Sequence, residues 1–170
     1  MPSTLNIETA DVYDISVLQR LAHQVWHAHY PTMITVEQID HMLEHGYSTE
    51  KIATEMTKEG ITWLKIMKDS KVIGFASFGP YDKKRLKLHK LYLSMDHHGQ
   101  GIGAAVLAEI ERRAASTVAT SIVLNVNKHN SKAIKSYKNS GYLVIESVIN
   151  DIGNGFVMDD YLMEKVLIQT

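Results

Sequence analysis

The sequence predicts one α/β domain, in which helices pack against a β-sheet. The chain has 170 residues, of which 45% are hydrophobic, and a domain of this length buries about 70% of its unfolded surface. Along the chain, apolar residues first recur at helical spacing and then alternate as in strands. After that, the apolar pattern predicts a strand, a helix and a second strand in succession. Because no repeat, low-complexity tract or Pro/Ser-rich linker interrupts residues 1–170, we expect a single domain.

A short strand and a long helix are expected first. Residues 5–8 have the pattern of a strand. Pro31 cannot continue a helix, so it should end the helix before it. That helix is indicated by apolar residues at helical spacing, namely Ile15, Leu18, Ala22, Val25 and Trp26.

Two shorter helices should follow. Thr35 and Gln38 have the spacing of a capping box, in which two side chains satisfy backbone N–H groups at a helix start. Gly46 is a suitable residue to end that helix. A third helix is expected to carry Ile52 and Met56.

A β-hairpin is predicted after these helices. The apolar period changes to two in residues 61–67 and 72–78, which is typical of half-buried strands. Residues 68–71 between them are polar, and we expect them to form a four-residue turn.

The next strand, residues 86–94, contains a break in its alternation. Its leucines fall at 86 and 88 and then at 91 and 93, so the phase slips by one residue at His89 and Lys90. A β-bulge produces such a slip and bends the strand. The bend would separate this strand from a parallel neighbour at residues 122–126 and open a slot between them. A regular strand buried on both faces fits the pattern equally well.

A helix over residues 101–115 should connect these two strands. Its apolar stripe consists of Ile102, Val106 and Ile110, and the unit is expected to be a right-handed crossover. A further helix over residues 131–140 should end at Gly141.

Two final strands are predicted at residues 144–149 and 156–166. Residues 150–155 between them are rich in Asn, Asp and Gly, a composition typical of a turn.

The segment 97–105 is a candidate anion-binding loop. It follows a predicted strand, opens a predicted helix and carries Gly99, Gly101 and Gly103. Glycines let the backbone approach a ligand closely, and the first N–H groups of a helix lack partners within it. The positive end of the helix dipole favours a phosphate. A glycine turn that only packs the helix on the sheet is the alternative.

Two well-known phosphate motifs fit this segment poorly. The ATP-type loop needs Lys and then Ser or Thr after its last glycine, but Ala104 and Ala105 follow Gly103. The dinucleotide pattern G-x-G-x-x-G/A is satisfied by Gly99, Gly101 and Ala104, yet it also needs an acidic residue about 20 positions later. Residues 114–139 contain no Asp or Glu.

A third motif fits better, because residues 91–110 and 124–142 together resemble the GNAT superfamily of N-acetyltransferases. The family's phosphate loop reads Gln/Arg-x-x-Gly-x-Gly/Ala, and His98, Gly101 and Gly103 stand at these positions, with His98 in place of Gln or Arg. The second motif matches without a departure, as Asn130-x-x-Ala133-Ile134-x-x-Tyr137-x-x-x-Gly141-Tyr142.

The resemblance implies a fold and a cosubstrate. We expect a mixed, mostly antiparallel twisted sheet of six or seven strands with four or five helices, in which a splayed parallel strand pair forms a slot for acetyl-CoA. The core that binds CoA would span residues 86–142. Its contact residues would be Leu91, Tyr92, Leu93, His98, Gly99, Gln100, Gly101, Ile102, Gly103, Ala104, Asn130 and Tyr137.

The implied reaction is direct acetyl transfer to a primary amine in a ternary complex. An alkylamine has a pKa of about 10 and must lose a proton before it attacks the thioester. The resemblance makes Tyr137 the proton donor to the CoA thiolate. His89 lies where family members often have a Glu, so it is the candidate base or the end of a water relay. By position alone, Asn130 is as well explained as a helix cap and Tyr137 as a core aromatic residue.

Composition excludes several other functions. A formal net charge of −1 and a pI near 6.8 give no electrostatic case for nucleic acid or an anionic membrane. The absence of cysteine excludes disulfides and thiol catalysis and is compatible with the cytoplasmic location that we expect.

Two pairs of histidines, His23/His27 and His41/His45, have the spacing that can chelate a metal on one helix face. No third ligand is evident in the sequence, so we expect no metal.

The acceptor amine is the least defined part of the prediction. A small amine such as a polyamine is favoured, with residues 26–30 expected to line its site and Asp151, Asp159 and Asp160 available to attract a cation. A protein N-terminus or lysine is an alternative acceptor. A non-catalytic acyl-CoA sensor and a nicotinamide-dependent oxidoreductase are alternative functions, and a homodimer stays open.

Overall fold

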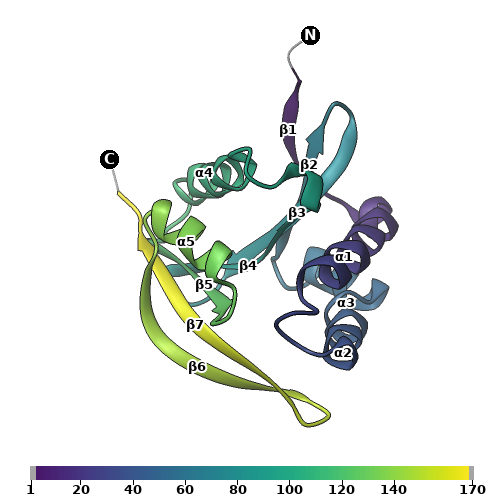
Figure 1. The fold of residues 1–170 in the computed structure, drawn as a ribbon. Helices are drawn as coiled ribbons and strands as arrows, with labels where there is room; N and C mark the ends of the chain where they lie inside the picture. The colour runs from purple at the N-terminus through teal and green to yellow at the C-terminus, as the bar shows by residue number, and fades with distance from the viewer. Residues whose placement is uncertain (1–2, 169–170) are drawn as a thin grey trace.

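Seven strands form one mixed sheet in the order β1-β2-β3-β4-β5-β7-β6 in a computed structural model that describes residues 3–168 (Figure 1). All neighbouring strands are antiparallel except β4 and β5. This confirms the mostly antiparallel sheet with a single parallel pair. The strands are β1 (Leu5–Thr9), β2 (Thr62–Lys68), β3 (Lys71–Pro80), β4 (Arg85–Leu93), β5 (Ser121–Asn127), β6 (Leu143–Gly153) and β7 (Phe156–Val166).

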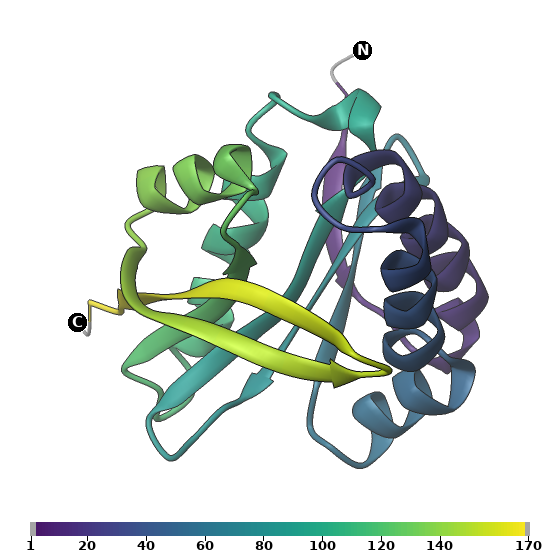
Figure 2. The ribbon, with the colours of Figure 1, turned by 60° about the horizontal axis from the view of Figure 1, so that its bottom comes forward.

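Helices cover both faces of the sheet (Figures 1 and 2). One face carries α1, α2 and α3, with a core that includes Trp26, Trp63 and Phe75. The other face carries α4 and α5, with a core that includes Val106 and Ile110. The five helices are α1 (Ile15–His29), α2 (Val36–Gly46), α3 (Thr49–Thr57), α4 (Ile102–Ala114) and α5 (Ser131–Asn139), with short 3-10 turns at Val12–Asp14 and Met95–His97.

The start of α2 shows why part of the predicted capping box does not form. Thr35 caps the helix as expected, since its hydroxyl oxygen accepts the N–H of Gln38 at 3.1 Å. The side chain of Gln38 does not return to the cap, because its amide donates to Val157 O in β7 at 2.9 Å. The predicted local bond is therefore replaced by one that fastens α2 to the last hairpin.

Both hairpin turns are shorter than the sequence suggested. The β2–β3 turn is only Asp69 and Ser70, with φ of 50° and 68°, and the β6–β7 turn is only Asn154 and Gly155, with φ of 53° and 78°. Two-residue turns with positive φ match the twist of antiparallel strands. The strands therefore extend into residues 68–71 and 150–155, which were expected to be loop.

The break in the alternation of β4 is a β-bulge. Ser77 in β3 lies opposite Lys90 and Phe78 lies opposite Leu88, so His89 is the extra residue of β4. The pairing of β4 with β5 covers residues 85–88 against 121–124 and ends there. The strands consequently diverge beyond the bulge, as the shift in leucine phase predicted.

Among the described residues, 3–168, no helix has both the length and the apolar character that crossing a membrane requires.

Close packing between β3 and β4 leads to a first prediction, for the substitution Gly74→Ala. A Cβ at Gly74 would lie 2.5 Å from Tyr92 O and 2.6 Å from Leu93 Cδ2, so Ala should lower the free energy of unfolding by about 2 kcal/mol. Urea denaturation would measure the change. Gly46→Ala is the matched control, because a Cβ there meets nothing within 4 Å at the end of α2, and it should be neutral or stabilising. Equal midpoints for the two variants would contradict the packing described.

Candidate functional site

A cavity of about 590 Å³ lies where β4 and β5 diverge. Its wall is built from the end of α1, the second half of β4, the loop before α4 with the first turn of that helix, the second half of β5, one side of α5 along its length and part of β7. Residues that are far apart in the sequence therefore meet at the end of the parallel pairing. Clefts of this kind are the usual place for a cosubstrate in an α/β sheet.

The backbone of β4 presents hydrogen-bonding groups to this cavity. Ser94 N donates to Ile73 O in β3 at 2.9 Å, and backbone groups of successive residues in a strand point in opposite directions. The N–H groups of Leu91 and Leu93 therefore point away from β3, toward the side where β5 has diverged. An extended ligand with amide groups can pair with this edge as an added strand would.

The loop before α4 forms an anion cradle at one end of the cavity. Gly99 and Gly101 have φ of 74° and 76°, a conformation that costs other residues energy. Gly101 is the N-cap of α4 and makes no side-chain capping bond. The N–H groups of Ile102, Gly103 and Ala104 therefore have no partners within the helix. This is the geometry that binds phosphate.

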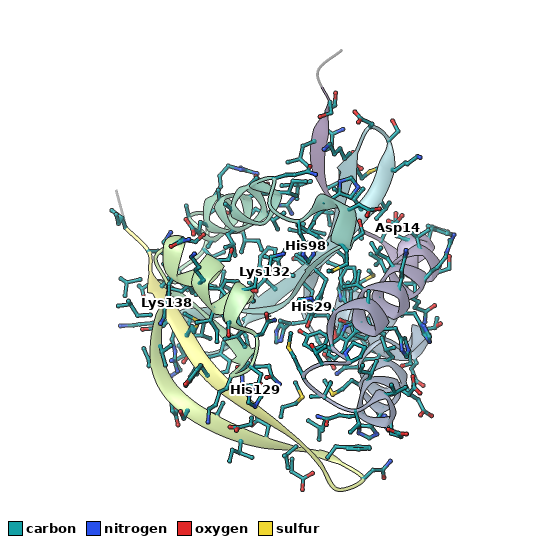
Figure 3. The ribbon with its side chains drawn as sticks, viewed as in Figure 1. Asp14, His29, His98, His129, Lys132 and Lys138 are labelled. Carbon is teal, nitrogen blue, oxygen red and sulfur yellow. The ribbon has the colours of Figure 1, made fainter. Side chains whose placement is uncertain are left out.

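Two histidines and a lysine, His29, His98 and Lys132, lie beside the cradle (Figure 3). The His98 Nε2–H donates to Leu93 O at 2.9 Å, and its Nδ1 accepts from Lys132 Nζ at 3.2 Å. The ring of His29 is 6.0 Å from that of His98. Burial lowers the pKa of His29, and the nearby His98 and Lys132 lower it further. A hydrogen bond with Asn130 raises this pKa and so opposes part of the shift. The ammonium of Lys132 is thus the fixed positive charge at this end.

Asn130 and Tyr137 connect α5 to the cavity. Asn130 Oδ1 caps α5 by accepting the N–H of Ala133 at 3.2 Å, and both Asn130 and Tyr137 line the cavity. The ring of Tyr137 packs edge-on against Tyr142 at 5.8 Å. Burial, with a smaller effect from Tyr30, raises the pKa of the Tyr137 hydroxyl, which therefore keeps its proton at neutral pH.

His89 projects from the bulge and also lines the cavity. Desolvation, followed by the charges of Lys90, Lys87 and Lys51, lowers its pKa to about 4. Its side chain is nevertheless exposed at the surface of the cavity. At pH 7 His89 is therefore neutral and able to accept a hydrogen bond or a proton.

The β6–β7 hairpin reaches across to α2 (Figure 2), and Met158 and Asp160 of its second strand line the cavity. His41 Nε2 bonds to Ile152 O at 2.6 Å, next to the bond from Gln38 to Val157 O. From the predicted acceptor segment 26–30, His29 and Tyr30 line the cavity. The hydroxyl groups of Tyr30 and Tyr92 are 3.2 Å apart.

The structure brings most of the predicted contact residues together. Gln100 is the exception, because its side chain bonds to Lys68 Nζ and Asp96 O and does not line the cavity. The remaining predicted residues all line it, namely His89, Leu91, Tyr92, Leu93, His98, Gly99, Gly101, Ile102, Gly103, Ala104, Asn130 and Tyr137.

Some cavity residues were not predicted. Lys132 and Asn125 line the wall. Their positions could have indicated this, because Asn125 is near the end of a predicted strand and Lys132 is near the start of a predicted helix.

The three candidate acceptor carboxylates differ in their surroundings. Asp151 caps its own turn and Asp159 pairs with Lys128, while Asp160 is the one of the three that lines the cavity.

The two histidine pairs do not gain a third ligand. The rings of His23 and His27 are 4.6 Å apart and those of His41 and His45 are 4.1 Å apart. Over residues 3–168, no group of three or more His, Cys, Asp or Glu side chains is arranged to hold a metal ion.

Comparison with known proteins gives a consistent result. Residues 22–142 match the family described as the acetyltransferase (GNAT) family. The spermidine N(1)-acetyltransferase of Thermoplasma acidophilum is 25% identical over 160 residues, which is 92% of this chain and 96% of that protein. A peptidyl-lysine N-acetyltransferase of Salmonella typhimurium is 25% identical over 126 residues, 72% of this chain and 79% of that protein.

Solved structures show the same fold. The PaiA N-acetyltransferase of Thermoplasma acidophilum, crystallised in complex with coenzyme A, superposes with a TM-score of 0.82 at 24% identity, covering 96% of this chain and 99% of that chain. The ribosomal-protein-S18-alanine N-acetyltransferase of Escherichia coli superposes with a TM-score of 0.74 at 15% identity, covering 98% and 96% of the two chains.

The anion cradle leads to a second prediction, for Gly101→Ala. Alanine is strained at φ of 76°, so this variant should lose about 1 kcal/mol of stability and displace the free N–H groups. Its Kd for CoA should rise about tenfold, the equivalent of one lost hydrogen bond to a charged group, as measured by calorimetry. Gly60→Ala is the control, since Gly60 has a similar φ of 69° and open space around it but does not line the cavity. It should lose similar stability and keep its affinity for CoA, so an equal loss of CoA affinity in the two variants would count against the cradle.

Proposed function

From the premise that this chain belongs to the GNAT acetyltransferase family and is an acetyl-CoA-dependent N-acetyltransferase, we propose that it acetylates a small primary amine. The amine would enter at the end of the cavity beneath the β6–β7 hairpin. The observation that carries the proposal is the slot between β4 and β5, which has an anion cradle at one end and is also lined by Met158 and Asp160 of the β6–β7 hairpin.

Acetyl-CoA fits the slot in one direction. Its diphosphate would accept hydrogen bonds from the free N–H groups at the start of α4, beside Lys132. Its pantetheine arm, which carries amide groups, would pair with the backbone of Leu91 and Leu93. Its thioester would then lie near the bulge, in reach of residues from β4, β5 and α5.

The reaction requires two proton acceptors and one donor. An alkylammonium loses a first proton to become an amine, and the amine nitrogen attacks the thioester carbon to form a C–N bond. The nitrogen then loses a second proton. As the C–S bond breaks, the sulfur leaves with the electron pair and takes up a proton. The developing oxyanion needs a fixed donor, and a backbone N–H at the bulge is suitably placed to be that donor.

Tyr137 is our candidate for the proton donor to sulfur. Its pKa is raised by burial, so it holds its proton until the thiolate forms nearby. The residue lines the cavity from α5, the helix whose first turn carries Lys132 beside the anion cradle. An acyl-CoA sensor without catalytic activity would not need this group.

His89 is our candidate for the second proton acceptor. An imidazole whose pKa is about 4 is too weak to deprotonate a free alkylammonium of pKa about 10. It can take a proton from the nitrogen after attack, because a nitrogen bonded to the tetrahedral carbon is far more acidic. His89 can act directly or through a water.

The acceptor class is supported by the relatives. The spermidine acetyltransferase aligns with 92% of this chain, whereas the peptidyl-lysine acetyltransferase aligns with 72%. The bonds from Gln38 and His41 also hold the hairpin, whose residues Met158 and Asp160 line the cavity, against α2. A fixed wall at this place favours a small amine such as a polyamine over a lysine or N-terminus on a folded protein.

A third prediction tests the proton donor with Tyr137→Phe. Removing the hydroxyl should lower kcat by at least about 100-fold and leave KM for acetyl-CoA nearly unchanged, in steady-state assays that detect free CoA thiol with spermidine as acceptor. Tyr142→Phe is the control: the neighbouring Tyr142 ring is fully buried, and its hydroxyl has no hydrogen-bond partner in residues 3–168. Unchanged kcat in Tyr137→Phe would remove Tyr137 from the mechanism.

A fourth prediction concerns pH. Since the pKa of His89 is lowered to about 4, the imidazole is neutral throughout pH 5.5–7.5, and His89→Gln should lower kcat/KM by about 100-fold without changing the shape of the pH profile there. His129→Gln, which changes a histidine outside the cavity lining, should leave both unchanged. A wild-type inflection near pH 6.5 that disappears in His89→Gln would show that the imidazole titrates normally and would contradict this role.

A further inference from the structure

Asp160 is an unusual residue of the acceptor end. It lies on β7 opposite Asn127 of β5 and Val148 of β6. Only 6% of it is exposed, yet it lines the cavity. Its neighbour Tyr161 packs against the α4 core, so the side chain of Asp160 points to the opposite face of the sheet, which α1 to α3 cover.

One oxygen of this carboxylate has no partner. Asp160 Oδ1 is buried and makes no hydrogen bond within residues 3–168, while the carboxylate is hydrogen-bonded to Asn125. A buried polar atom without a partner is costly, and such groups in native proteins need an explanation. A carboxylate oxygen at the wall of a cavity is explained by a ligand that donates a hydrogen bond to it.

We propose that Asp160 binds the ammonium group of the acceptor and takes its first proton. The inference rests on the proposed function and supplies the acceptor for the first proton: unlike the neutral imidazole of His89, a carboxylate holds the ammonium by its opposite charge while it takes the proton. Asp160 reaches the slot from β7, while Tyr137 reaches it from α5 on the other face. The acceptor nitrogen would therefore lie between the group that prepares it and the group that releases the thiol.

The charges around Asp160 suit this role. Burial raises the pKa of its carboxyl group, Asp159 raises it further, and Asn125, Lys87 and Lys128 oppose the rise. From α1, Tyr30 also faces the carboxylate. Desolvation of an ammonium in the same cavity would lower its pKa. The proton affinities of the two groups thus approach each other, which is the condition for transfer within the bound complex.

The proposed step balances. The carboxylate of Asp160 takes H⁺ from R–NH₃⁺ to give a carboxylic acid and R–NH₂, whose lone pair attacks the thioester carbon. The nitrogen gives its second proton to His89, and Tyr137 protonates the departing sulfur. The net change is R–NH₃⁺ and acetyl-CoA to the N-acetylamine, CoA thiol and one H⁺, which leaves through solvent.

The adjacent residue provides a matched control. Asp159 is also an aspartate on β7, but its carboxylate pairs with Lys128 at 2.6 Å and does not line the cavity. Asp160→Asn keeps the size of the side chain and removes the charge, and Asp159→Asn makes the same chemical change one residue away. Asp160→Ser, a smaller replacement, is the second variant in case Asn cannot be accommodated.

The experiment measures acetyl transfer to spermidine between pH 4 and 9, together with spermidine binding to each protein's CoA complex by calorimetry. Thermal melting and the Kd for CoA show that each variant is folded. Asp160→Asn should lose at least about 100-fold in kcat/KM for spermidine, bind spermidine at least tenfold more weakly, and lose the acidic limb of the pH profile. That limb arises because the carboxylate must be ionised to hold an ammonium, so activity rises with pH. Asp159→Asn should retain all three properties.

The outcomes separate the inference from the proposed function. If wild type and Asp160→Asn acetylate spermidine equally well, the role of Asp160 is wrong and the acetyltransferase function stands. If kcat/KM falls but the acidic limb and spermidine affinity persist, Asp160 is only structural, and the inference is again overturned. If wild type acetylates no primary amine in a panel that includes spermidine and lysine peptides, the proposed function itself fails and the inference with it.

Discussion

The site depends on one constraint in the sheet, which is that β4 pairs with β3 along most of its length but with β5 along only half of it. The extra residue His89 changes the register between β3 and β4 and turns the second half of β4 away from β5, so that parallel pairing ends at Leu88 and Leu124. The N–H groups beyond that point face a cavity instead of a strand. In the proposed reaction, the cradle at α4 and the hydroxyl on α5 act on the same molecule because the slot between these strands connects them.

The two ends of the cavity differ in their electrostatics, as the reaction demands. At the α4 end, free N–H groups and Lys132 favour a diphosphate. Farther along the cavity, on β4, β7 and α5, burial and neighbouring groups lower the pKa of His89 and raise those of Asp160 and Tyr137. Environments that separate the proton affinities of neighbouring groups are a physical basis for assigning acid and base roles.

Much of this could be predicted from the sequence, where the signal was local. The leucine phase in residues 86–93 predicted the bulge. The glycines of segment 97–105 predicted a loop at a helix start that a ligand can approach closely, and two of them, Gly99 and Gly101, have positive φ in the structure. Contacts between distant segments could not be predicted. Gln38 bonds to β7 instead of completing its capping box, and Asp160 differs from Asp159 only by the strand face on which it lies. Both depend on the tertiary arrangement of the hairpin.

The most direct measurement of the central claim is amide hydrogen exchange, by NMR, at individual residues of β4. On addition of CoA, the amides of Leu91 and Leu93 should become strongly protected, since the pantetheine arm would pair with them, while that of Tyr92, whose N–H faces β3, should change little. Protection that appears elsewhere, with Leu91 and Leu93 exchanging as fast as before, would contradict the account, because CoA would then bind without using the slot between the two strands.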